Sequence, residues 1–204
     1  MHSAELLTVR LAFGAFFAVI VVFCTLRGFV TWWQTGRSPF VAVTGGRLNL
    51  DFVEVMGLAT WLALVLHYAV KGPFGPWVFK GAVYPYLHYV GLLCIALACA
   101  IFAGAIKRLG RSWRIGIDRE HPGDLVSTGI YGLVRHPIYL ALQLAASGIF
   151  GMAPNVTFGI CALLVVAGTW RQAYAEEAFL AVRYPDTYPA YMRETGRFLP
   201  KLFS

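Results

Sequence analysis

The run from Val83 to Ile106 decides the fold class: it reads VYPYLHYVGLLCIALACAIFAGAI, without a single Asp, Glu, Lys or Arg. A helix needs about 20 apolar residues to cross a hydrocarbon core about 30 Å thick, so this run is long enough to cross a membrane. It is continuous rather than alternating, which indicates a helix and not a strand of a membrane barrel. Hydrophobic residues make up 58% of the 204-residue chain and charged residues 13%. We therefore predict an all-α integral membrane protein.

Four further apolar segments flank this run. They are residues 11–26, 52–70, 138–150 and 156–170. The first continues to Trp32 and Trp33, which are typical of anchors at the membrane edge. The last two are joined by residues 151–155 and predict a short helical hairpin, whose first arm would be about 20 Å long at 1.5 Å per residue. The sequence thus predicts about five transmembrane helices.

Lysine and arginine are distributed unevenly around these segments. If all five segments cross, one side of the membrane receives Arg37, Arg47, Lys107, Arg108, Arg111, Arg114, Arg119, Arg135, Arg171, Arg183, Arg193, Arg197 and Lys201. The other side receives Arg10, Lys71 and Lys80. Short cytoplasmic loops are enriched in these residues, so we predict that the 107–136 connection and the tail face the cytoplasm and that the N-terminus lies outside. We expect a prokaryotic cytoplasmic membrane.

The net charge of +7 mostly reflects this asymmetry, with some attraction to anionic lipid headgroups. Membrane lipids, rather than nucleic acid, are therefore the expected partners, and the sequence leaves the oligomeric state open. We expect a single membrane domain over residues 1–204. In it, residues 1–106 supply three N-terminal helices and residues 107–204 a catalytic half, with a pocket formed by the 107–136 connection and the tail. The four cysteines lie in apolar segments without a Cys-x-x-Cys pair, so we expect neither disulfides nor a metal site.

Polar residues cluster in residues 125–139, which read LVSTGIYGLVRHPIY. Pro137 suits the first turn of a helix and disfavours helical geometry at His136, so a new helix should begin there. Arg135 and His136 would then lie at a helix N-terminus, which offers free N–H groups to an anion. Gly129 allows backbone to approach a ligand closely. The alternative is that Arg135 and His136 only bind phospholipid headgroups.

Glu176 and Glu177 follow the last apolar segment directly. Uncompensated carboxylates are costly beside a membrane and are usually paired. Adjacent helical residues point about 100° apart, so the two side chains should have different partners. One would face the hydroxyls or ammonium of a ligand, and the other would pair with an arginine such as Arg135 or Arg171. The alternative is a solvated pair at a helix end.

Together, these residues resemble the isoprenylcysteine carboxyl methyltransferase family, relatives of the membrane phospholipid methyltransferases. The matching elements are residues 109–118, Gly129-x-Tyr131, Arg135-His136-Pro137-x-Tyr139, Glu176-Glu177, Tyr184, Tyr188, Tyr191 and Leu199-Pro200. The resemblance covers about the last hundred residues. It implies methylation that depends on S-adenosyl-L-methionine, with the cofactor in a cytoplasmic pocket and a lipid-like acceptor entering from the bilayer.

The resemblance also implies roles for particular residues. Backbone at Leu125 and Val126 would border the adenine. The remainder of the cofactor would be enclosed by Gly129, Tyr131, His136, Pro137, Tyr139, Glu176 and Glu177, with Tyr188 and Tyr191 closing over it.

Methyl transfer from a sulfonium is an in-line displacement, for which a protein supplies mainly proximity, alignment and a dry site. For a carboxylate acceptor, such as an isoprenoid or prenylcysteine-like acid, Arg135 or Arg171 would hold the carboxylate by a planar two-point contact. No general base is then needed. A neutral amine or hydroxyl would require one, for which His136 and a glutamate, Glu176 in particular, are the candidates.

Other functions stay open at this point. A lipid amine N-methyltransferase would use the same pocket. The sterol reductases share features of this C-terminal half but use NADPH, although they usually have more spans, and no added basic cluster for the extra phosphate is evident here. A non-enzymatic membrane protein, such as a small transporter or an assembly factor, could also have this fold. In the N-terminal half, Asp51 and Glu54 are expected at a helix N-terminus, where the helix dipole favours acidic side chains.

Overall fold

The computed structural model describes residues 3–40, 50–78, 83–116 and 124–201. The long helices are α1 (Ser3–Thr35), α3 (Leu50–Lys71), α4 (Tyr84–Leu109), α5 (Pro137–Met152) and α6 (Val156–Arg183). Two 3-10 turns, η1 (Gly110–Ser112) and η2 (Gly129–Gly132), and a short helix, α7 (Tyr188–Glu194), complete the fold. Within these ranges there is no strand, only isolated bridges, so the prediction of an all-α protein is confirmed. Arg47, Lys80, Ile117, Asp118, Arg119 and the side chain of Asp51 lie outside the described residues.

Each of the five predicted apolar segments forms a helix. Three of these helices are long and apolar enough to cross a membrane, over Ala4–Thr35, Tyr84–Ser112 and Val156–Arg183. Only 22–33% of each apolar stretch is buried inside the protein, so most of its surface is left for lipid. The helix α5 is apolar but shorter, and α3 is not among the three. The membrane character is thus confirmed, while crossing by α3 and α5 stays a prediction.

The helix α6 is longer than the sequence predicted. The apolar pattern ends at Trp170, but α6 continues to Arg183, so the prediction of a short final helix was wrong. Residues 171–183 contain neither Gly nor Pro and are rich in Ala, and Ala and the two Glu residues favour helix. Pro185 disfavours helical geometry at Tyr184, where the helix ends. With 28 residues, α6 is about 42 Å long and carries Glu176 and Glu177 within it rather than after it.

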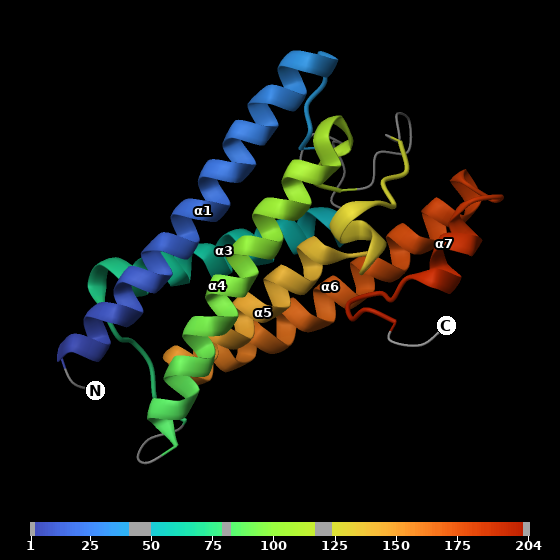
Figure 1. Cartoon of the computed structure of the whole chain (residues 1–204). Helices are drawn as coiled ribbons and strands as arrows, with labels where there is room; N and C mark the ends of the chain where they lie inside the picture. Colours follow the sequence, from blue (N-terminus) through green and yellow to red (C-terminus); the bar gives the residue numbers. More distant parts are fainter. Residues whose placement is uncertain (1–2, 41–49, 79–82, 117–123, 202–204) are drawn as a thin grey trace.

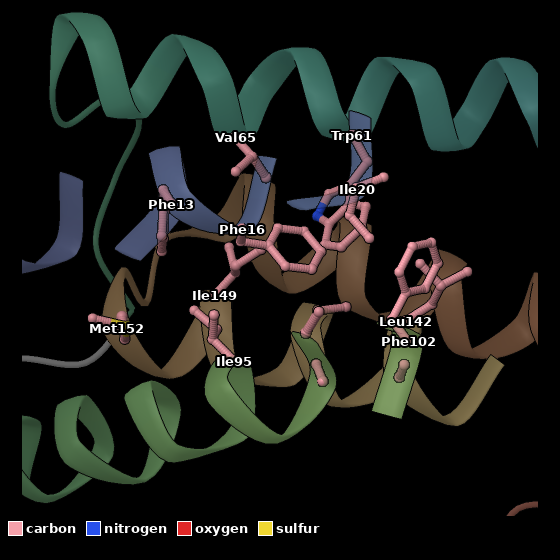
Figure 2. Close-up of a cluster of buried hydrophobic side chains, with 14 of the residues drawn as sticks. Phe13, Phe16, Ile20, Trp61, Val65, Ile95, Phe102, Leu142, Ile149 and Met152 are labelled. Atoms are coloured by element: carbon pink, nitrogen blue, oxygen red, sulfur yellow. The ribbon is translucent and has the colours of Figure 1, made fainter. Parts of the chain in front are cut away.

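The helices pack around one apolar core. Figure 1 shows α4, α5 and α6 side by side, α1 along α4, and α7 and the tail beside the end of α6. In Figure 2, Trp61 and Val65 of α3 point toward Phe16 and Ile20 of α1, between α3 and the α4–α5 pair. All four side chains are buried. The outer faces are also apolar: Leu93 on α4 is 59% exposed.

Glycines bring α4 and α5 into close contact. A Cβ atom on Gly91 of α4 would lie 2.5 Å from the carbonyl oxygen of Gly148 on α5, and one on Gly148 would lie 2.6 Å from the carbonyl oxygen of Gly91. A Cβ on Gly151 would likewise come within 3.0 Å of the carbonyl oxygen of Leu87. Close packing of small residues is a common way for helices to associate in membranes. This crossing holds the C-terminal part of α5 closely against α4.

Candidate functional site

A cavity of about 600 Å³ runs from the middle of the helix bundle to the tail. Its volume lies in the range of roughly 300–1,000 Å³ typical of small-molecule sites. Along α6 its wall runs from Cys161 through Thr169 and Gln172 to Glu176 and Leu180. Apolar residues of five helices line the part toward the bundle, namely Ile20, Leu58, Trp61, Phe102, Leu142 and Val165. Polar and aromatic residues line the other part, namely Asp124, Tyr131, Arg135, His136, Tyr139, Glu176, Tyr188 and Tyr191.

Residues 125–139 form one wall of this cavity. The η2 turn begins at Gly129, whose φ of +66° favours glycine. The Nε of Arg108 donates a hydrogen bond to the Thr128 carbonyl at 3.2 Å, which attaches the loop to the end of α4. His136 is non-helical (φ −124°, ψ 62°) and α5 begins at Pro137, so the predicted helix start is confirmed.

Glu177 is the centre of a buried ionic cluster. The residue is 4% exposed. Its Oε1 lies 2.9 Å from Nη2 of Arg135 and 3.2 Å from Nε2 of His136, and its Oε2 lies 2.6 Å from Nη2 of Arg197. Of the two arginines that the sequence offered as partners for a glutamate, Arg135 therefore takes this position. Arg197, which the sequence analysis placed only among the tail cations, completes the cluster.

Glu176 faces the cavity and has different partners. Its Oε1 accepts a hydrogen bond from the Tyr139 hydroxyl at 2.5 Å, and its Oε2 lies 3.5 Å from Nδ1 of His136. Its side chain is 28% exposed, against 5% for Glu177. The prediction that the adjacent glutamates have different partners is thus confirmed. Glu176 keeps accessible carboxylate surface for a ligand, whereas Glu177 is enclosed.

His136 lies between the two carboxylates. Burial lowers the pKa of its imidazole, but hydrogen bonds with Glu176 and Glu177 outweigh burial, and the pKa is raised overall. Because each ring nitrogen faces a carboxylate oxygen, an imidazolium could donate to both. The ring also stacks on Tyr139, with the planes 10° apart. His136 is thus placed to hold the two glutamates in position.

The tail is part of the same assembly. The backbone N–H groups of Arg135 and His136 donate to the carbonyls of Gly196 and Arg197 at 2.8 and 3.1 Å. Nη1 of Arg135 also donates to the carbonyls of Met192 and Thr195. These bonds hold the residues after α7 against the start of α5.

Arg197 contacts aromatic rings as well as Glu177. Its guanidinium carbon lies 3.8 Å from the centre of the Tyr174 ring, a cation–π distance. The hydrogen bonds with Glu177 raise the pKa of Arg197 further above its ordinary value. The one indication in the sequence was that two adjacent glutamates beside an apolar segment require several cations nearby.

The structure gathers most of the predicted site residues at this cavity. Its lining includes Leu125, Val126, Tyr131, Arg135, His136, Pro137, Tyr139, Glu176, Tyr188 and Tyr191. Gly129, Glu177 and Arg171 are outside the lining. Gly129 shapes the loop that precedes α5, and Glu177 binds Arg135 and Arg197 outside the cavity. Arg171 instead lies beside α3, where its Nε is 2.6 Å from Oε1 of Glu54.

Several cavity residues escaped the sequence analysis. Asp124, Thr169, Gln172 and Trp61 all line the cavity, but none belongs to a motif. Gln172 precedes Glu176 by four residues and therefore shares its helix face, a signal that was available once the glutamates had been singled out. The contributions of α1 and α3 had no such signal.

The family model described as phospholipid methyltransferase matches residues 86–187, half of the 204-residue chain. The chain is 28% identical over 155 residues to the cobalt-zinc-cadmium resistance protein CzcN of Cupriavidus metallidurans, covering 74% of this chain and 67% of that protein. It is 27% identical over 187 residues to a methanethiol S-methyltransferase of a Pseudomonas species, covering 86% and 66%.

A third relative, the nickel-cobalt-cadmium resistance protein NccN of Alcaligenes xylosoxydans, is 27% identical over 55% of this chain and 49% of its own length. The chain thus spans about half to two thirds of the length of these relatives. Among the described residues, no group of three or more His, Cys, Asp or Glu side chains is placed to hold a metal ion. The match over residues 86–187 includes α5, all of α6 and the cavity-lining Glu176, and by it the chain belongs to the phospholipid methyltransferase family.

Proposed function

We propose that the protein transfers a methyl group from S-adenosyl-L-methionine to a lipophilic acceptor, most specifically to the carboxylate of an isoprenoid or prenylcysteine-like acid. One observation carries the proposal: one cavity joins the accessible carboxylate of Glu176 to a part walled by apolar side chains of α1, α3, α4, α5 and α6. A polar cofactor and an apolar acceptor can occupy such a cavity together. Membership of a methyltransferase family supports a methyl donor rather than NADPH as the cofactor.

The polar part of the cavity fits S-adenosyl-L-methionine. The Glu176 carboxylate suits the ammonium group, and Asp124 suits hydroxyl groups of the ribose. The hydroxyl of Tyr188 is buried without a hydrogen-bond partner among the described residues, an unusual state for a buried polar group and one that a nearby ligand can relieve. When bound, this cofactor would supply a methyl group already activated on a sulfonium.

The ionic cluster favours an acceptor that is already an anion. Both ring nitrogens of His136 face carboxylates, so the imidazole is poorly placed to take a proton from an acceptor. A carboxylate needs no general base, whereas a neutral amine does. The two arginines considered for holding the acceptor are engaged by glutamates, Arg135 by Glu177 and Arg171 by Glu54. We therefore assign them to holding the site together.

A second candidate is S-methylation of a thiol. The relative named methanethiol S-methyltransferase favours it, because its match covers 86% of this chain. A thiol would have to lose its proton. Glu176, which lines the cavity beside His136, is the carboxylate that could accept this proton. Comparing acid, thiol and amine acceptors of equal chain length separates these reactions.

Calorimetric titration of the purified protein with S-adenosylhomocysteine tests the cofactor, with NADPH in parallel. We expect micromolar-range binding of S-adenosylhomocysteine, weakened about tenfold or more in Glu176→Gln, since a hydrogen bond to a charged group contributes roughly 1.5–3 kcal/mol. Glu194→Gln is the matched control, because Glu194 is exposed on α7 and outside the cavity lining. Binding of NADPH alone would point to a reductase, and binding of neither would favour a non-enzymatic role.

The proposal includes an orientation, with the polar end of the cavity toward the cytoplasm of a prokaryotic cell and the N-terminus outside. The charge distribution supports it. In a variant with its four cysteines replaced by serine, single cysteines at the exposed Lys71 and Arg183 test it. A membrane-impermeant maleimide should label Lys71→Cys in intact cells and Arg183→Cys only after lysis. The reverse pattern would invert the orientation.

A further inference from the structure

Gln172 offers the cavity a hydrogen-bond donor that the protein itself does not use. The residue is 7% exposed and lines the cavity. Its Oε1 accepts a hydrogen bond from Nη2 of Arg171 at 3.3 Å. Within the described ranges, its amide nitrogen has no hydrogen-bond partner. This nitrogen is also not among the fully buried atoms that lack a partner, so it is not sealed off by the protein. Because Gln172 lines the cavity, its amide N–H groups are available to a molecule bound there.

Neighbouring charges fix the direction of this amide. The guanidinium of Arg171 is held by Glu54 of α3, with 2.6 Å between Nε and Oε1. The same guanidinium binds the carbonyl oxygen of Gln172. With its oxygen turned toward Arg171, the Gln172 amide presents its nitrogen to the cavity. Glu54, Arg171 and Gln172 thus form a chain that connects α3 to the cavity wall.

Gln172 lies where the polar and apolar parts of the cavity meet. Glu176 is one helical turn away on the same face of α6, about 6 Å along the axis. In the other direction the wall continues through Val165 and Leu164, which is 66% exposed on the outer surface although it also lines the cavity. Gly57 of α3 also lines the cavity, and a Cβ there would meet nothing within 4 Å. The apolar part is therefore open toward the lipid-facing surface.

We propose that the amide of Gln172 binds the head group of the acceptor by donating a hydrogen bond to one oxygen of a lipophilic carboxylate. The hydrocarbon chain then extends past Val165 and Leu164, and the second carboxylate oxygen faces the methyl group of the cofactor, whose ammonium Glu176 would hold. Arg171 and Glu54 act as positioning residues, because they orient the amide without touching the acceptor. This inference rests on the proposed methyl transfer and names the residue that selects its acceptor.

The arrangement satisfies the balance of the reaction. The second carboxylate oxygen forms a bond to the methyl carbon while the bond from that carbon to sulfur breaks, and the electron pair of the broken bond stays on sulfur. The negative carboxylate and the positive sulfonium are both neutralised, and no proton moves. The ester accepts a weaker hydrogen bond from Gln172 than the carboxylate did, which favours release of the product.

Binding of radiolabelled dodecanoate to the purified protein saturated with S-adenosylhomocysteine tests the inference, with dodecylamine and dodecanethiol as competitors. Gln172→Met should weaken dodecanoate binding about tenfold or more, the loss expected for one hydrogen bond to a charged group. Gln172→Glu should abolish dodecanoate binding and improve that of dodecylamine, a reversal that a merely structural role would not produce. Arg171→Lys should weaken dodecanoate binding by a smaller factor.

The controls separate this inference from the proposed function. Gln34→Met, on an exposed position of α1 outside the cavity, should bind dodecanoate as the wild-type protein does. S-adenosylhomocysteine should bind Gln172→Met and Gln34→Met as it binds the wild-type protein. Unchanged dodecanoate affinity in Gln172→Met, or binding of dodecanethiol but not dodecanoate to the wild-type protein, would overturn the role of Gln172. If the wild-type protein did not bind S-adenosylhomocysteine, the proposed function itself would be refuted.

Discussion

Replacing Glu177 by alanine is expected to destabilise the folded protein by about 3–5 kcal/mol, the cost of removing one partner from a buried ion pair. Arg135, Arg197 and His136 all lie within 3.2 Å of this carboxylate, and their charges would be left facing one another. The tail should detach from the start of α5, because Arg197 would lose its buried partner. Limited proteolysis and thermal unfolding of the detergent-purified protein measure both effects.

Glu176→Ala is the matched control for this prediction. It removes the neighbouring carboxylate, whose side chain is 28% exposed and which leaves Arg135 and Arg197 paired. We expect it to lower ligand affinity strongly and stability only slightly. Equal unfolding temperatures for Glu177→Ala and the wild-type protein would show that the ionic cluster does not hold the tail.

Gly148→Ala is expected to prevent normal packing of α4 against α5. The new methyl group would lie 2.6 Å from the carbonyl oxygen of Gly91 and 3.0 Å from the side chains of Cys94 and Ile95. The backbone of a helix cannot move aside like a flexible side chain, so the two helices must separate. Overpacking of this kind typically costs about 1–3 kcal/mol, occasionally more. The yield of monodisperse protein and its thermal unfolding temperature measure the effect.

Gly104→Ala, on the same helix α4, is the matched control. Nothing lies within 4 Å of a Cβ at that position, so the alanine should be neutral or stabilise the helix by up to about 1 kcal/mol. If the two alanine variants behaved alike, the close contact between α4 and α5 would have no energetic consequence.

The sequence predicted those features that depend on local patterns. Continuous apolar runs located the five helices, and the geometry that proline imposes placed the start of α5 at Pro137. The 100° between adjacent helical residues predicted separate partners for Glu176 and Glu177. The resemblance to a methyltransferase family implied roles for eleven residues, and nine of them line the cavity, from Leu125 to Tyr191.

The features that the sequence did not reveal depend on contacts between distant segments. Arg171 was considered for holding the acceptor, but it pairs with Glu54, 117 residues earlier in the chain. Arg197 was one tail cation among several, and only the packing of the tail against α5 brings it to Glu177. The length of α6 was underestimated because its last turns are polar and amphipathic rather than apolar, so hydropathy alone could not extend it.

The close crossing of α4 and α5 tolerates fewer amino-acid substitutions than other parts of the molecule. A side chain added at Gly91 or Gly148 would meet the backbone of the facing helix within 3 Å. The α3 wall is less constrained at Gly57, which lines the cavity and where a Cβ would meet nothing within 4 Å. During evolution, substitutions on α3 are therefore expected to reshape the apolar part of the cavity more readily than substitutions at the contact between α4 and α5.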